Sequence, residues 1–140
     1  MSFKYQKEID NLPCDCPDLS EFKPHNGQVF RFVHSNLNHP DNFKPVNFIE
    51  DREHEDCKSK CAGYGLSFWM TKGKAEKKLT NFIKNAPNFA QRVGTCVAEG
   101  IICQHDGLIG QKSGSGHVTF HEFEETVFNN RFVIVTNLNQ

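Results

Sequence analysis

The sequence lacks the long apolar runs that cross or enter membranes. No stretch approaches the ~18 apolar residues of a transmembrane helix, and residues 1–10, MSFKYQKEID, carry charges where a secretory signal has its apolar core. A basic excess is also missing, since 16 Lys and Arg stand against 17 Asp and Glu, a net charge of −1. Phosphate binding normally requires a positive surplus, so nucleic acid is not favoured as a partner. We expect a cytoplasmic protein with no membrane association.

Other absences exclude further classes. The chain has no internal repeat, which excludes a solenoid. Ser67 lies between Leu66 and Phe68 and not in a Gly-x-Ser-x-Gly elbow, so the sequence gives no support to serine hydrolase chemistry. Only one Trp and two Tyr accompany 13 Phe. This imbalance predicts a core packed with Phe and few aromatic platforms on the surface.

The size of the chain favours one domain. With 140 residues, of which 37% are apolar, it can bury about two-thirds of its unfolded surface without help from a metal or a disulfide. Residues 1–27 hold three of the six prolines and show little periodicity. We expect them to form an irregular N-terminal arm laid over a domain of residues 28–140.

The clearest elements are a strand and a helix. Residues 29–33, VFRFV, are apolar on both faces apart from one Arg, as in a strand that is covered on both sides. Residues 65–70 predict a second, aromatic strand, and Thr71 can cap the helix that follows. From residue 72 to 86 the apolar residues recur at helical spacing, and Pro87 follows.

The chain after residue 92 reads as strands. The segments are 93–98, 101–103, 108–109, 118–124 and 128–136, with a hairpin expected at Asp106-Gly107. The order of elements predicts an α+β fold in which a mixed, mainly antiparallel sheet packs against one principal amphipathic helix.

The six cysteines support two interpretations. Without an export signal we expect reduced thiols, most simply as small apolar side chains in the core, and this applies most directly to Cys96 and Cys103 in the predicted strands. The alternative is a structural zinc site, because thiolate and imidazole are zinc ligands. Its ligands would be taken from a set that the sequence places in two segments: Cys14, Cys16, His54, Cys57 and Cys61.

A second group of candidates combines a guanidinium with two carboxylates. By strand alternation Arg31 shares its face with Val29 and Val33, so we expect it to need an anionic partner inside the domain. Glu122 and Glu124 are two apart and would project from one face of a strand. Arg31 could pair with one of them as a structural ion pair, or it could bind the diphosphate of a ligand.

An Arg on the first core strand, a Ser on the next and a Glu-x-Glu before the last strand resemble the Arg, Ser-Thr-Ser, Glu-x-Glu pattern of ADP-ribosyltransferases. The resemblance spans residues 29–135 and implies an NAD-binding enzyme. Arg31 would bind the phosphates or the nicotinamide ribose of NAD, Ser67 would brace the site, and Glu124 would stabilise the oxocarbenium-like transition state. Glu122 would orient the acceptor. Lys72 and Lys74 would add attraction for phosphate.

The predicted helix has a cationic face, which does not by itself identify a binding partner. Residues 72–92 hold six Lys and Arg against one acid, which is typical of a solvated face. If this face binds something, an acidic protein surface or a nucleotide fits its charge. The alternative to an enzyme is therefore a small accessory or protein-binding module, with or without the zinc site.

Overall fold

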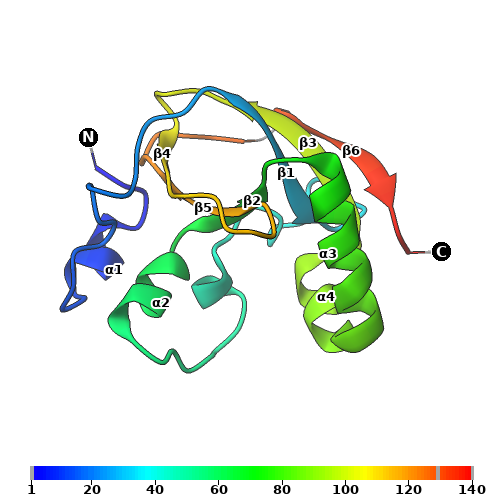
Figure 1. Ribbon diagram of the computed structural model, residues 1–140, viewed down its shortest axis with the longest axis horizontal. Coiled ribbons are helices and arrows are strands. Elements are labelled where there is room, and N and C mark those ends of the chain that lie inside the picture. Colours follow the sequence, from blue (N-terminus) through cyan, green and yellow to red (C-terminus); the bar gives the residue numbers. More distant parts are fainter. Residues whose placement is uncertain (1, 129, 140) are drawn as a thin grey trace.

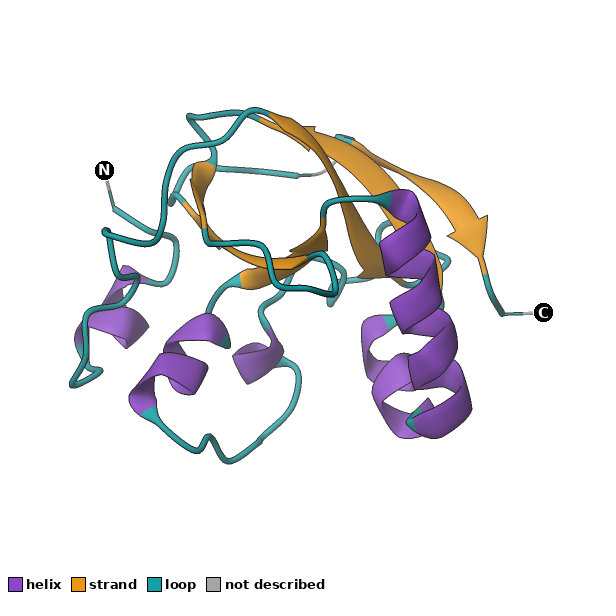
Figure 2. Cartoon of the chain, viewed as in Figure 1, coloured by secondary structure: helices purple, strands orange, loops and turns teal. Residues whose placement is uncertain are grey.

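The apolar run near residue 30 forms β1 (Gly27–Val33), an interior strand of a six-stranded antiparallel sheet. The computed structural model describes residues 2–128 and 130–139. The strand order is β4-β5-β2-β1-β3-β6, and the sheet is strongly curved (Figure 2). The other strands are β2 (Leu66–Trp69), β3 (Cys96–Ile102), β4 (Gly107–Ile109), β5 (His117–Glu122) and β6 (Phe132–Asn137). The expected α+β class is confirmed, with every strand pair antiparallel.

The helices lie on one side of the sheet in Figure 1. They are α1 (Gln6–Asp10), the 3-10 helix η1 (Val46–Phe48), α2 (Cys57–Ala62), α3 (Lys72–Asn85) and α4 (Pro87–Val93). Thr71 caps α3 as expected, because its side chain accepts from the amide of Lys74 at 3.3 Å. Pro87 ends α3 and also opens α4, which the sequence analysis missed, because proline suits the first turn of a helix. Among the described helices, none has both the length and the hydrophobicity that crossing a bilayer requires.

The core has two parts, one on each face of the sheet. On one face Phe68 of β2 and Phe120 of β5 pack against Phe128 and Phe132, with ring centroids 5.3 to 6.1 Å apart. On the other face Phe30, Phe32 and Trp69 meet Ala75 and Leu79 of α3. The expectation of a Phe-packed core is therefore met, and α3 buries its apolar stripe as its spacing predicts.

Several expected strand boundaries and one expected hairpin are wrong. The strand expected at 118–124 ends at Glu122, so Glu124 does not share a strand face with it, and the strand expected at 128–136 begins at Phe132. Residues 96–102 form one continuous strand that includes Gly100. The ring of Phe132 packs against Gly100 so closely that a Cβ there would lie 2.7 Å from it. The Asp106 turn exists, but it makes no hairpin. Instead three strands, β5, β2 and β1, lie between β4 and β3 in the sheet order. The Asp106 carboxylate accepts from the amide of Cys103 at 2.7 Å and pairs with Arg131 beside β6.

Replacing Phe68 by Ala tests the importance of the Phe cluster. Phe68 is fully buried between Phe120, Phe128 and Phe132. We expect Phe68→Ala to lower the free energy of unfolding by about 3–5 kcal/mol in urea titrations. Phe48→Ala is the matched control, because Phe48 is 43% exposed and should cost much less. Equal losses from the two substitutions would contradict the assignment of Phe68 to the core.

Candidate functional site

The three strands that carry the candidate residues are neighbours. Arg31 comes from β1, Ser67 from β2 and Glu122 from the end of β5, and these strands follow one another in the order β5-β2-β1. Sheet pairing therefore places on adjacent strands residues that are up to 91 positions apart in the sequence, residue 31 to residue 122. The site is best understood from Arg31 outwards.

Arg31 is held by backbone carbonyls and not by a carboxylate. Its Nε donates to the carbonyl of Asn42 at 2.6 Å, and its two terminal nitrogens donate to the carbonyls of Ser67 at 3.0 Å and Lys44 at 3.2 Å. The side chain is buried, with 8% exposure. The expected anionic partner is thus replaced by three neutral acceptors, because the loop after β1 turns its carbonyls toward the guanidinium.

These bonds form where the sheet opens. β1 and β2 pair at Phe30 and Trp69 alone. Beyond that pair the carbonyl of Ser67 in β2 accepts from the guanidinium of Arg31 and not from a backbone amide of β1. Burial lowers the pKa of Arg31 to about 10, while Glu122 and Tyr5 oppose that shift. Because this value is still far above neutral pH, Arg31 remains a cation inside the domain.

A small cavity of about 80 Å³ adjoins this opening. Its walls combine two polar groups of the sheet with aromatic and aliphatic side chains: Arg31, Phe32, Asp41, Val46, Ile49, Ala62, Gly65, Ser67, Trp69, Phe89 and Val93. The indole Nε1 of Trp69 is buried without a hydrogen-bond partner among the described residues. Since buried donors are normally paired, this wall retains an unused donor.

Ser67 is fixed by a histidine that the sequence did not link to it. The Oγ of Ser67 lies 2.9 Å from Nε2 of His117 on β5. Burial, and to a lesser extent the charge of Lys78, lower the pKa of His117 below its usual value, so the neutral imidazole prevails at pH 7. The pair thus orients the hydroxyl at the cavity wall.

Glu122 is closed off by the N-terminal arm. Lys4 Nζ lies 3.0 Å from Oε2 of Glu122 and also donates to the carbonyl of Thr126 at 2.6 Å. The other oxygen, Oε1, is buried without a hydrogen-bond partner among the described residues. Burial raises the pKa of Glu122, whereas Lys4 and Arg31 lower it. The ion pair of this carboxylate is therefore with the arm.

Three other candidate residues lie away from this group. Glu124 is exposed, and its amide donates to the carbonyl of Ser2 at 2.9 Å. Lys72 and Lys74 are exposed in the first turn of α3, outside the cavity. Lys74 instead lines a separate open depression beside the loop at Gly114, together with other lysines of α3.

Four of the six cysteines are paired, which corrects the expectation of reduced thiols. Disulfides join Cys14 to Cys57 and Cys16 to Cys61, and so fasten the arm to α2. The ring of His54 has a different partner, because its Nε2 lies 2.8 Å from Oδ1 of Asn47. The acidic segment 50–56 is not helical, so the helical spacing assumed for His54 and Cys57 does not apply. Cys96 is free and buried as expected, and Cys103 is free and partly buried.

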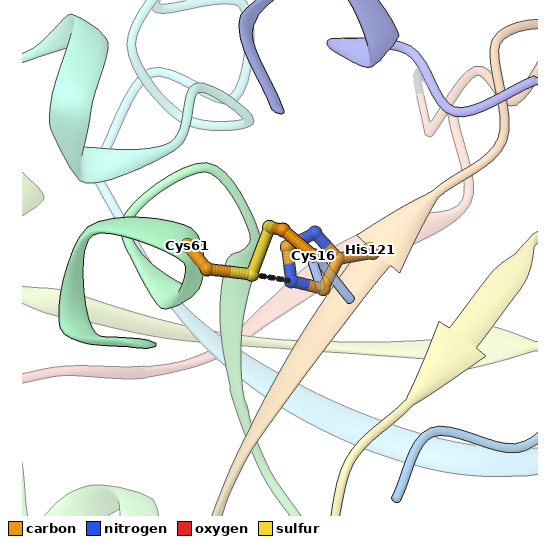
Figure 3. A group of neighbouring side chains, drawn as sticks. All are labelled: Cys16, Cys61 and His121. Atoms are coloured by element: carbon orange, nitrogen blue, oxygen red, sulfur yellow. Dashed lines mark hydrogen bonds between the residues drawn. A yellow bond between two sulfur atoms is a disulfide. The ribbon is translucent and has the colours of Figure 1, made fainter. Parts of the chain in front are cut away.

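A different histidine approaches the cysteines. His121 of β5 has its Nε2 3.9 Å from Sγ of Cys61, and the ligand atoms of Cys16, Cys61 and His121 all lie within 4.8 Å of one another (Figure 3). Burial lowers the pKa of His121 to about 4, so its ring is neutral at pH 7. These residues form a Cys/Cys/His group of the kind that can hold a metal ion, although both sulfurs belong to a disulfide here.

Sequence reasoning missed the residues that complete the site. Each of these residues contacts a partner that is more than seven positions away in the sequence: Lys4, Asn42, His117 and His121. The smallest separation is that between Asn42 and His34. For His117 a signal existed, since it lies in a predicted strand. The pairing of that strand with β2, which brings it to Ser67, is decided by the sheet order.

Comparison with protein families, with curated proteins and with solved structures finds no match for the chain.

Replacing Arg31 by Lys tests the role of the three carbonyl bonds. An ammonium cannot reproduce the planar fork that reaches Asn42, Lys44 and Ser67 together. We expect Arg31→Lys to lower the free energy of unfolding by about 2–4 kcal/mol, because it leaves buried carbonyls without donors. Arg52→Lys is the control, since Arg52 is exposed and pairs with Glu50 at the surface. A variant as stable as the parent would show that the bonds contribute nothing.

Replacing Lys4 by Met tests the docking of the arm on Glu122. The substitution leaves a buried carboxylate without its cation, and we expect a loss of about 1–3 kcal/mol in the free energy of unfolding. Combining it with Glu122→Gln should recover part of the loss, since the two residues are coupled. Lys7→Met, at an exposed position of the same arm, is the control. Simple additivity in the double variant would argue against the contact.

Proposed function

We propose that the chain binds NAD at the opening between β1 and β2 and transfers its ADP-ribose to an acceptor. One observation carries the proposal: Arg31, Ser67 and Glu122 come from three neighbouring strands, and Arg31 and Ser67 line one cavity. The resemblance to ADP-ribosyltransferases requires Arg31, Ser67 and a carboxylate of the Glu-x-Glu pair to share one site, and this adjacency supports that for Glu122, not for Glu124. The resemblance alone could not predict that these strands would be adjacent.

The cavity suits one end of the dinucleotide. Its free space of about 80 Å³ accommodates a planar ring and not a whole NAD, for which sites of about 300–1,000 Å³ are usual. Phe32, Trp69 and Phe89 give it aromatic walls, and the unpaired Nε1 of Trp69 offers a donor to the carboxamide of nicotinamide. The ribose and the phosphates would then extend outwards past Arg31.

In the proposed reaction the bond between nicotinamide and ribose C1′ breaks, and its electron pair leaves on nicotinamide. The acceptor forms a new bond to C1′, and its proton passes to solvent. Positive charge develops on the ribose, so a carboxylate nearby stabilises the transition state. We assign this role to Glu122 and not to Glu124, because Glu122 is buried, its charge acts on Arg31, and its Oε1 has no hydrogen-bond partner among the described residues, whereas Glu124 is exposed.

Arg31 and Ser67 serve the same site in different ways. The carbonyl bonds of Arg31 keep the opening between β1 and β2 in shape, and its retained charge attracts the phosphates. His117 fixes the hydroxyl of Ser67 at the cavity wall, where it can bond a polar group of the ligand.

The proposal predicts a nicotinamide signal that depends on one carboxylate. We expect the full chain to bind NAD in calorimetry and to release nicotinamide, measured by chromatography. Glu122→Gln should slow the release by about 10²–10³-fold, as expected for one electrostatic contact to the transition state. Glu124→Gln, two residues away and exposed, should leave the rate unchanged.

Two results would contradict the proposal. If the parent chain gives no heat with NAD and releases no nicotinamide, the enzymatic function is wrong and a non-enzymatic accessory or protein-binding module remains. If Glu124→Gln is impaired and Glu122→Gln is not, the assignment of the carboxylate is wrong.

We also propose that the Cys/Cys/His group takes zinc when its cysteines are reduced. Thiolate and imidazole are the ligands of structural zinc, whereas calcium and magnesium prefer oxygen. The convergence of Cys16, Cys61 and His121 supports this. Zinc there would supply structure and no catalytic step, and it is compatible with either an enzyme or a binding module.

A further inference from the structure

The group around His121 is built from three segments that are distant in sequence. Cys16 lies in the N-terminal arm, Cys61 lies in the last turn of α2 and His121 is in β5. Cys61 and His121 are 6% and 3% exposed, and the rings of Phe3 and Phe22 lie against the imidazole, with centroids 6.2 and 5.2 Å away. A buried imidazole whose nitrogen faces two sulfurs has the setting of a metal ligand.

We propose that the cysteine cluster exchanges between two disulfides and a zinc site, in which Cys16, Cys57, Cys61 and Nε2 of His121 are the four ligands. This inference rests on the zinc proposal above and adds the identity of the ligands and the exchange. It replaces His54 with His121 and leaves Cys14 outside the site.

In the oxidised form the distance from His121 to Cys61 is close to the one that zinc requires. Zn–S bonds of about 2.3 Å and Zn–N bonds of about 2.0–2.1 Å at tetrahedral angles separate a sulfur from a nitrogen by about 3.6 Å and two sulfurs by about 3.8 Å. Nε2 of His121 already lies 3.9 Å from Sγ of Cys61. The sulfurs of Cys16 and Cys61 must separate from bonding distance, and with Cα atoms 5.6 Å apart side-chain rotation can provide this.

The fourth ligand follows from the helix. Cys57 and Cys61 are four residues apart in α2 (Cys57–Ala62), so their side chains lie on one face, about 5–6 Å apart at Cβ. Two ligands at this spacing on a helix are a recurring arrangement in zinc proteins. Cys14 has no such constraint, because it lies in the irregular arm and is held by its disulfide to Cys57.

The exchange balances with a dithiol as the reductant. Two equivalents of dithiol reduce the two disulfides to four thiols and become two cyclic disulfides. Zinc then displaces three thiol protons, from Cys16, Cys57 and Cys61, and binds His121 as the neutral imidazole. The arm stays fastened to α2 in both forms, by covalent bonds in one and by the metal in the other.

The first experiment counts the ligands on the full chain. The chain is reduced with dithiothreitol under nitrogen, loaded with zinc and freed of excess metal. We expect one zinc per chain by elemental analysis, and three sulfurs and one nitrogen by zinc X-ray absorption. Absence of zinc would overturn this inference and the zinc proposal together. Four sulfurs would overturn the role of His121 and leave the zinc proposal standing.

Matched variants test the individual ligands. In competition with a chelator, His121→Asn and Cys57→Ser should lower the zinc affinity by at least about 100-fold, whereas His54→Asn and Cys14→Ser should leave it unchanged. Unfolding of oxidised His121→Asn shows whether that variant still folds with its disulfides, and the ligand count on the parent chain does not depend on it. Loss of zinc in the two control variants, with retention in the other two, would overturn the ligand set.

Discussion

The guanidinium of Arg31 is the contact on which the centre of the molecule depends. It donates to carbonyls of β2 and of the loop after β1, and so it bridges the place where β1 and β2 separate. Buried carbonyls need donors, and a buried cation needs compensation. One side chain meets both needs. The cavity adjoins the opening between β1 and β2 that Arg31 bridges.

The same arrangement limits what Arg31 can do for a ligand. Three of its donors are committed to the fold, so its part in binding is to shape the opening and to supply a charge. Among the described residues, the buried side-chain atoms without a hydrogen-bond partner are Nε1 of Trp69, Oε1 of Glu122 and Oε2 of Glu8. Trp69 lines the cavity, whereas Glu122 lies at the far end of β5, so the two atoms belong to different parts of the sheet.

The N-terminal arm connects the two candidate sites. Lys4 pairs with Glu122, and further along the arm Cys14 and Cys16 form disulfides with α2. His121 of the cysteine cluster is adjacent in sequence to Glu122, so both sites share the end of β5. The two disulfides and the Lys4–Glu122 ion pair therefore hold the same arm against α2 and the end of β5.

The sequence by itself determined the α+β class, the Phe-packed core, β1, β2 and the capped helix α3, because these depend on periodicity, capping and β-propensity within short windows. It also singled out Arg31, Ser67, Glu122 and Glu124, of which Glu124 is exposed and lies beyond the end of β5. Only the tertiary structure decided their partners: the carbonyls on Arg31, His117 on Ser67, Lys4 on Glu122 and His121 on the cysteines. Those contacts depend on strand order and on the path of the arm, and local spacing carries no information about which distant strands will pair.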